Sequence, residues 1–468
     1  MSITFIKNGK IMRNFALKGT TIAVSIVLLT ACGGSGFYAS QQSGSSASNA
    51  SSGSSTSSGS STSSSSSTST ALLVSITSST TFFVGQSASF TATSSDANVT
   101  YAWNFGDGQT ATGIQATHTY ATTGTYNVTV TVTNSSGQTA TSVPVGVQIN
   151  PKLALLAGSL TGATGTTDGT GAAALFTFPS SVATDSQGNA YVVDANTIRK
   201  ITPAGVVSTY YSSNLMGSDG IAVDSGSNVY VVLGTALHKI TPAGVDSVIA
   251  TGLGVGSQNP NATLGFNTRG MTLDSTNNIY ITDHFACAIY KVTPTGVVTT
   301  LAGGITCGHA DGTGTTAQFE ALGGITFDPS SGNLYVADTE SSTIRQVTLT
   351  GAVTTFAGTA YNSGIANGTG AAALFTVPAS LTVDQSGNVY VADTGLSPNP
   401  SHGYVGGETI RKITPNGVVT TIAGTPENPG FQFTTYPGLI TEPLGIALLP
   451  DGRLVFSSGE AILTMTGL

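Results

Sequence analysis

One phrase recurs five times in this chain and constrains its fold more than any other feature. TIRKITPNGVVTTIAG begins at Thr409, and close variants begin at Thr197, Leu237, Ile289 and Thr343. Each copy joins two short runs of alternating apolar and polar residues, the pattern of half-buried β-strands, across a turn. A unit repeated in this way buries its apolar face against its neighbours, so the sequence predicts a repeat architecture.

Each repeated unit reads as four short strands of the types SLTVD, NVYVAD, IRKIT and GVVTTIAG. A sixth unit, LGIALLPDGRLVFSSGEAILTMTG, supplies three strands, and KLALLAG at residues 152–158 supplies a fourth. A ring closed in this way has no exposed sheet edges, which predicts a six-bladed β-propeller. The aspartates that end the first strands of the five complete units are Asp185, Asp224, Asp274, Asp328 and Asp384.

The strand order, the D-x-x-GN turn and the KITP-x-G turn resemble NHL repeats over residues 152–468. The resemblance implies that residues 151–468 form an NHL-type propeller in which 152–158 closes the sixth blade. Leu233 departs from the pattern, because other units have aspartate there.

A second all-β domain is predicted before the repeats, at residues 71–150. YAWNFGDG (101–108), HTY (118–120) and GTYNVTVTVTN (124–134) resemble the PKD domain, an immunoglobulin-like β-sandwich. Trp103 is the single tryptophan of the chain and is expected to pack between the sheets. Asn104 stands where the motif usually has aspartate, and His118 is expected to belong to the framework of the fold.

The N-terminus resembles a bacterial lipoprotein leader. Residues 1–31 are a basic segment followed by an apolar run too short to span a bilayer, and Leu29-Thr30-Ala31-Cys32 resembles a lipobox. We expect Cys32 to be the lipidated mature N-terminus; an ordinary cleaved signal peptide is the alternative. Residues 32–70 are rich in Ser, Thr and Gly and are expected to form a disordered tether.

Charge excludes several classes of partner. Four of the 14 basic residues lie in the leader, so ten remain against 22 acidic residues, a net charge near −12. Nucleic-acid binding needs clustered Lys and Arg, which this composition lacks.

Two cysteines remain after the predicted lipidation. Cys287 falls in the second loop of blade 3 and Cys307 in the connector that leaves this blade, so a disulfide is expected in an oxidising compartment, with two free thiols as the alternative. His284, His309 and Asp311 flank the cysteines and are metal-ligand types. An NHL enzyme, the peptidylglycine amidating lyase, carries zinc, but it needs more inward-facing histidines than this chain has. Asp283 matches Asp194, Asp338 and Asp393 and is interpreted as a turn-capping residue.

Aromatic residues and connectors mark one end of the predicted propeller. Three connectors share a DGTG-like turn, at which no helix is expected to begin: 167–176, 310–319 and 366–375. These connectors end in Phe176, Phe319 and Phe375, which are expected to fill the gaps between blades. An insertion at 395–408 enlarges the second loop of blade 5. The remaining aromatic residues at this end have two interpretations. They form either a stacking surface for a ligand or a small satellite core under long loops. They are Phe285, Tyr361, Tyr404, Phe431, Phe433 and Tyr436.

These features together predict a lipid-anchored, monomeric, non-enzymatic binding or adhesion protein without a cofactor. It is expected in the bacterial cell envelope, at the outer membrane or cell surface, and is expected to take an extracellular glycan or protein ligand through loops at one end of the propeller. The alternative is a metal-dependent lyase or hydrolase that works on the propeller face.

Overall fold

The structure, a computed structural model, describes residues 6–7, 10–11, 71–213, 215, 220–253, 268–304, 306–395, 407–426 and 428–468. Near the N-terminus, β1 (Ile6–Lys7) pairs with β2 (Lys10–Ile11) in antiparallel fashion. Cys32, the predicted tether and Tyr404 lie outside the described residues. No helix within the described ranges is both long and apolar enough to cross a bilayer.

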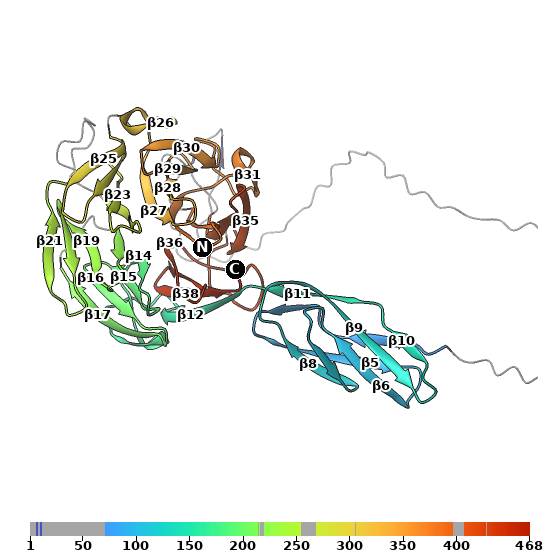
Figure 1. Ribbon diagram of the computed structural model, residues 1–468. Coiled ribbons are helices and arrows are strands. Elements are labelled where there is room, and N and C mark those ends of the chain that lie inside the picture. Colours follow the sequence, from blue (N-terminus) through green and yellow to red (C-terminus); the bar gives the residue numbers. More distant parts are fainter. Residues whose placement is uncertain are drawn as a thin grey trace, which may run out of the picture. The chain divides into compact units, whose positions relative to one another are not determined.

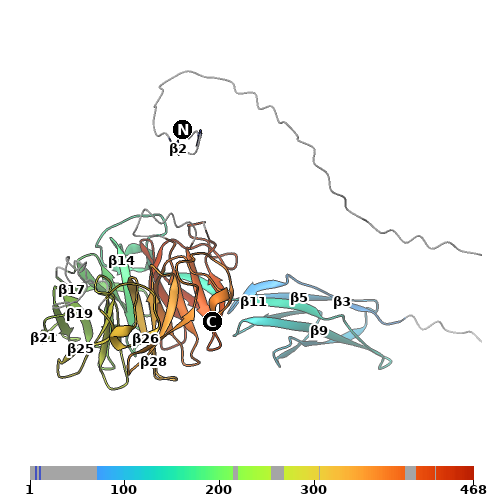
Figure 2. The same cartoon turned by 90° about the horizontal axis from the view of Figure 1, so that it is seen from above.

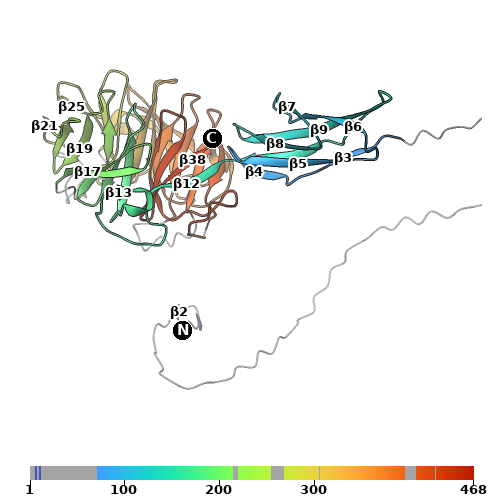
Figure 3. The same cartoon turned by 90° about the horizontal axis from the view of Figure 1, so that it is seen from below.

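Residues 74–150 form a two-sheet sandwich (Figure 3). One sheet contains β3 (Val74–Thr77), β5 (Ser87–Ser94) and β8 (Gln115–Thr119). The other contains β4 (Thr81–Phe83), β6 (Val99–Asn104), β7 (Thr110–Thr112), β9 (Gly124–Asn134), β10 (Thr139–Thr141) and β11 (Val145–Asn150). Trp103 is 1% exposed and packs against Phe90 and Phe105, so its predicted position in the core is confirmed.

The GDG turn of the sandwich explains why asparagine is accepted at position 104. The Asn104 Oδ1 atom accepts a hydrogen bond from the Gly106 backbone N–H at 2.9 Å, which an aspartate would accept equally well. Gly106 has φ +84°, and a Cβ there would meet the Asn127 carbonyl oxygen at 2.9 Å. His118 stacks on the Phe105 ring and lies 2.7 Å from Asp107 Oδ2, which places it in the framework as expected.

Residues 152–468 build a β-propeller of six sheets within the described ranges, here called blades 1 to 6 (Figure 1). The strands of each blade are given from the innermost outward. Blade 1 contains β14 (Pro179–Thr184), β15 (Ala190–Asp194), β16 (Thr197–Ile201) and β17 (Val206–Ser212), and blade 2 contains β18 (Ile221–Val223), β19 (Val229–Leu233), β20 (Ala236–Ile240) and β21 (Asp246–Ala250). Blade 3 contains β22 (Thr268–Leu273), β23 (Ile279–Asp283), β24 (Ala288–Val292) and β25 (Val298–Gly303). Figure 1 shows β17 and β21 on the outside of the ring, and Figure 2 shows the same blades from a direction turned by 90°.

Blades 4 to 6 continue the same order. Blade 4 contains β27 (Leu322–Asp328), β28 (Asn333–Asp338), β29 (Thr343–Thr348) and β30 (Ala352–Ala357); blade 5 contains β32 (Pro378–Val383), β33 (Val389–Asp393), β34 (Thr409–Ile413) and β35 (Val418–Ala423); and blade 6 contains β36 (Pro443–Leu448), β37 (Leu454–Ser458), β38 (Ala461–Thr466) and β12 (Lys152–Gly158). β12 pairs antiparallel with β38, from Lys152 opposite Thr466 to Gly158 opposite Ala461. The N-terminal strand thus supplies the fourth strand of blade 6.

The recurring D-x-x-GN turn has a structural task in each blade that carries it. In blade 1, Asp185 accepts hydrogen bonds from the backbone N–H groups of Gln187 and Asn189 and from the Tyr191 hydroxyl. The turn between the first and second strands is therefore tied to the second strand. The same aspartate–tyrosine bond recurs in blades 2, 3 and 5, as Asp224–Tyr230, Asp274–Tyr280 and Asp384–Tyr390.

The connectors with DGTG-like turns seal the gaps between blades. Phe176, Phe319 and Phe375 are fully buried, which confirms the predicted plugs. The expectation that no helix begins at these turns was wrong, because one 3-10 turn follows each of them: η1 (Gly171–Ala173), η2 (Gly314–Thr316) and η3 (Gly370–Ala372). Before each turn a two-residue strand pairs with the outermost strand of the blade: β13 (Gly169–Thr170), β26 (Gly312–Thr313) and β31 (Gly368–Thr369).

Candidate functional site

The second loops and the connectors meet at one end of the propeller, here called the connector end. A second loop joins the second and third strands of a blade, and a connector joins the fourth strand to the next blade. Backbone hydrogen bonds join the two kinds of segment in blades 3, 4 and 6: Gly304 N–H to Cys287 O, Tyr361 N–H to Ser341 O, and Ser159 N–H to Glu460 O, at 3.0–3.2 Å. The described residues Phe285, Cys287 and Tyr361 belong to these segments.

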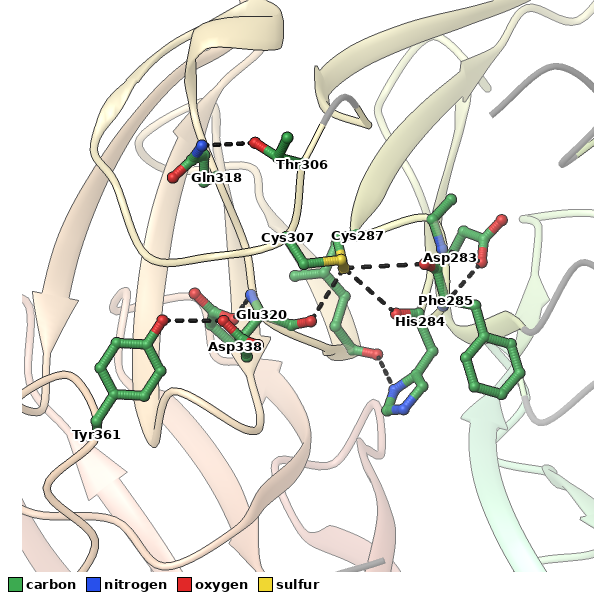
Figure 4. The surroundings of a disulfide bond; sticks show 12 residues. Asp283, His284, Phe285, Cys287, Thr306, Cys307, Gln318, Glu320, Asp338 and Tyr361 are labelled. Atoms are coloured by element: carbon green, nitrogen blue, oxygen red, sulfur yellow. Dashed lines mark hydrogen bonds between the residues drawn. A yellow bond between two sulfur atoms is a disulfide. The ribbon is translucent and has the colours of Figure 1, made fainter. Parts of the chain in front are cut away.

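The predicted disulfide is present. Cys287 and Cys307 are bonded, with their Cα atoms 5.5 Å apart, so the second loop of blade 3 is covalently tied to the connector between blades 3 and 4 (Figure 4). Cys287 is 1% exposed and has φ +51°, a left-handed conformation. The bond therefore fixes a loop that already has little conformational freedom.

His284 lies beside the disulfide and is a poor proton acceptor. Its Nδ1 atom is 3.2 Å from the Leu322 carbonyl oxygen, and its ring meets Phe285 edge-on at 5.3 Å (Figure 4). Burial, together with the positive charge of Arg269, lowers the pKa of His284 to about 4. The imidazole is therefore neutral near pH 7, and its Nδ1–H donates to the carbonyl.

His309 and Asp311, the other two candidate metal ligands, belong to the bonding network around Arg345. Asp311 Oδ1 lies 2.8 Å from Arg345 Nη2, and His309 contacts the hydroxyls of Ser341 and Thr355. Within the described part of the chain, no three His, Cys, Asp or Glu side chains are grouped as metal ligands. Both residues thus have partners within this network.

Asp283 caps its own loop, as the repeat pattern predicts. Its Oδ1 atom accepts hydrogen bonds from the backbone N–H groups of Phe285 and Ala286, each at 3.1 Å. The matching Asp338 instead accepts from the Glu320 backbone N–H in the connector and pairs with Arg345. Blade 3 has Tyr290 at the position of this arginine, opposite Ile281 in the strand pairing.

The candidate aromatic residues do not form one continuous surface. Phe431 and Phe433 contact each other and are packed against the core of blades 5 and 6, as the satellite-core interpretation expects. Phe285 lies against His284, whereas Tyr361 lies against His309 and is 61% exposed. Tyr436 is 39% exposed. Tyr361 is thus the candidate with the most accessible ring among those described.

The centre of the propeller holds a cavity of about 200 Å³ lined by the innermost strands. Arg269 is the single charged side chain among its described lining residues, and the others are small, apolar or hydroxyl-bearing. Sequence reasoning did not select Arg269. The signal was available, since Arg269 stands five residues before the closing Asp274, where blades 1, 4 and 5 have small residues; blade 2, with Asp219, also has a charged residue there.

Comparisons with known proteins agree with both folds. Residues 73–149 match the family model of the PKD domain. A Bacteroides thetaiotaomicron protein of unknown function is similar in structure, with 18% identity, a TM-score of 0.56 and coverage of 85% of this chain and 98% of that one. An auxiliary nutrient binding protein from Bacteroides ovatus has 15% identity, a TM-score of 0.55 and coverage of 82% and 95%.

A putative phosphatase from Bacteroides thetaiotaomicron is also similar, with 14% identity, a TM-score of 0.51 and coverage of 84% and 97%. No curated protein sequence matches the chain significantly. At these identities the structural likeness shows the fold alone. The chain therefore contains a PKD domain followed by a β-propeller.

Proposed function

We propose that this protein is a lipid-anchored, non-enzymatic binding protein of the bacterial cell envelope, whose NHL-type propeller takes a glycan or protein ligand at the connector end. The observation that carries the proposal is the disulfide between Cys287 and Cys307, which stiffens two loops at this end. Long segments held on a rigid scaffold are the usual place of recognition. Exposed aromatic rings, Phe178 and Tyr361, stand at the same end.

The anchor rests on the Leu29–Cys32 motif and has a direct test. Replacing Cys32 with Ser removes the thiol that receives the lipid, so the variant should leave the membrane fraction, whereas the wild type stays there. Continued membrane association of the variant would contradict the anchor. The same variant provides soluble protein for binding experiments.

A binding role agrees with one structural relative, the auxiliary nutrient binding protein from Bacteroides ovatus. The putative phosphatase with the same fold would instead favour an enzymatic role. Neither description transfers at 14–15% identity, so the function has to be measured on this chain.

The binding end is tested with matched surface variants. Soluble Cys32→Ser protein is first used to find a ligand on glycan and protein arrays. Phe178→Asp then alters the connector end, where Phe178 is 56% exposed and its N–H binds Asp194 Oδ1. Val245→Asp is the control at the opposite end, in the turn between β20 and β21, where Val245 is 61% exposed. The proposal is supported if Phe178→Asp weakens binding and Val245→Asp does not. It is overturned if Val245→Asp weakens binding and Phe178→Asp does not.

The alternative function, a lyase or hydrolase, is favoured by one observation. Burial and the positive charge of Arg269, which lines the central cavity, lower the pKa of His284, so its imidazole is neutral near pH 7. The Nε2 atom of a neutral imidazole can accept a hydrogen bond from a bound substrate while a guanidinium binds an anionic group of it. Metal analysis of the purified protein, and the effect of His284→Ala on any turnover, distinguish this alternative from pure binding.

A further inference from the structure

Tyr361 combines an exposed ring with a strained backbone. It has φ +60°, in the left-handed region, and its side chain is 61% exposed. A bulky residue rarely adopts this conformation, because its Cβ crowds the following carbonyl group. Strain of this kind is concentrated at functional sites, where the surrounding structure maintains it.

The connector into blade 1 shows how the same turn is made without strain. This connector runs from Gly158 to Gly165, and the Gly165 N–H donates a hydrogen bond to the carbonyl oxygen of Phe176. Between Gly158 and Gly165, the one residue with a left-handed backbone is Gly162, with φ +78°. The connector into blade 5 runs from Gly358 to Gly364, bound to Phe375 in the same way. Its one left-handed residue between these ends is Tyr361. Glycine is the unstrained choice at such a position.

The protein holds the Tyr361 ring in one orientation. The hydroxyl donates to Glu320 Oε2 at 2.9 Å (Figure 4). The backbone N–H donates to Ser341 O at 3.0 Å, and the ring lies edge-on to that of His309, with the centroids 6.3 Å apart. Burial and the Glu320 carboxylate raise the pKa of Tyr361 to about 12, so the hydroxyl stays protonated and keeps donating. A ring fixed before binding loses little entropy when a ligand arrives.

We propose that Tyr361 is a stacking platform for a sugar ring, with Glu320 accepting a hydrogen bond from a sugar hydroxyl. A sugar ring has an apolar C–H face, which fits an exposed aromatic ring, and hydroxyls at its edge, which donate to a carboxylate. The exposed neighbours Asn362 and Ser363 are uncharged, and residues 359–372 contain no charged side chain. This segment adds no charge to the Glu320 carboxylate, which suits hydroxyl donors such as those of a sugar, and the acidic chain disfavours anions.

The inference rests on the proposed function, because it assigns a ligand class to the connector end. Its test begins with Cys32→Ser protein and a glycan array, followed by calorimetric titration of the best oligosaccharide. Tyr361→Gly and Tyr361→Ala should each weaken binding at least tenfold, and Tyr361→Phe should weaken it less because the ring remains. Val297→Ala, in the turn between β24 and β25 at the opposite end, is the matched control for loss of an exposed apolar side chain, and it should bind as the parent protein does.

Stability supplies the second readout. Tyr361→Gly should melt at a higher temperature than Tyr361→Ala, because both lose the ring and alanine alone keeps the left-handed strain. Equal melting of these two variants, unchanged sugar affinity in Tyr361→Gly, or no glycan binding by the parent protein would each overturn the inference. Binding of a basic peptide that weakens steeply with salt would also overturn it. If the sugar inference fails but Phe178→Asp weakens the binding of a protein ligand, the proposed binding function at the connector end is still supported.

Discussion

The Nη1 atom of Arg345 lies 2.7 Å from Oδ2 of Asp338, and both side chains are fully buried in blade 4. The guanidinium also binds Asp311 and lies over the Phe319 ring at 5.3 Å. The pair therefore fastens the connector to the blade. It is repeated as Arg199–Asp194 in blade 1 and Arg411–Asp393 in blade 5.

Breaking this pair from one side should be costly. Arg345→Leu leaves the Asp338 carboxylate buried without its cation, so we expect the free energy of unfolding to fall by about 3–5 kcal/mol. Urea denaturation followed by circular dichroism measures the change. Tryptophan fluorescence would not, because the single tryptophan, Trp103, lies in the core of the other domain.

Blade 6 supplies the control for this experiment. It has Ser458 and Leu463 at the positions of Asp338 and Arg345, and the Ser458 hydroxyl accepts the Thr441 N–H at 2.9 Å. The double variant Asp338→Ser with Arg345→Leu should therefore be more stable than Arg345→Leu alone. A double variant that is less stable than the single one would contradict this account.

The disulfide should contribute to stability through the unfolded chain. It closes a loop of 20 residues between Cys287 and Cys307, for which the chain-entropy model gives about 3 kcal/mol. Reduction should lower the melting temperature of the wild type. A Cys287→Ala, Cys307→Ala variant should melt at a lower temperature than the oxidised wild type, with and without reductant. Its own melting temperature should not change when reductant is added. An unchanged wild-type melting temperature after complete reduction, checked by thiol alkylation, would refute the contribution.

His284 should make stability depend on pH in a defined window. Its folded-state pKa, about 4, lies below the ordinary value of 6.5, so the unfolded chain takes up the proton first as pH falls. Above about pH 6.5 the His284 imidazole is neutral in both the folded and the unfolded chain, so it does not change the free energy of unfolding. Between pH 6.5 and 4 the unfolded chain binds the proton, and the free energy of unfolding falls progressively as pH falls. His284→Gln should flatten the stability profile in this window, and an identical slope in both proteins would argue against a buried neutral imidazole.

Local signals account for the parts of the fold that were predicted correctly. The alternation in IRKIT and GVVTTIAG and the turns between them depend on neighbouring residues, so strand order can be read along the chain. The disulfide followed from counting cysteines and from placing Cys287 and Cys307 on adjacent segments. The 3-10 turns at Gly171, Gly314 and Gly370 were missed because three-residue turns have no periodicity to detect.

The site was less predictable because its contacts are distant in sequence. Arg345 meets Asp311 across 34 residues, and Tyr361 meets Glu320 across 41. Comparison between blades was an available signal: the arginine of the IRKIT-type strand is present in blades 1, 4 and 5, where aspartate ends the second strand. Blade 2 lacks both residues, with Leu233 and His238 in their places. The left-handed conformation of Tyr361 has no such sequence signal.

Closure by β12 gives the last prediction. Seven residues, Lys152–Gly158, cover the edge of β38, and Leu153 and Ala157 are buried against the neighbouring blades. A protein that begins at Ser159 should expose that edge and the apolar residues beneath it, because no other described strand pairs with this side of β38. We expect aggregation, and faster proteolysis within β36–β38 than in the Cys32→Ser protein. A matched control that begins at Pro151 keeps β12 and should resist protease, which separates the loss of β12 from the loss of the PKD domain. If the protein that begins at Ser159 melts and resists protease as this control does, β12 is dispensable and the ring is closed by contacts among the innermost strands alone.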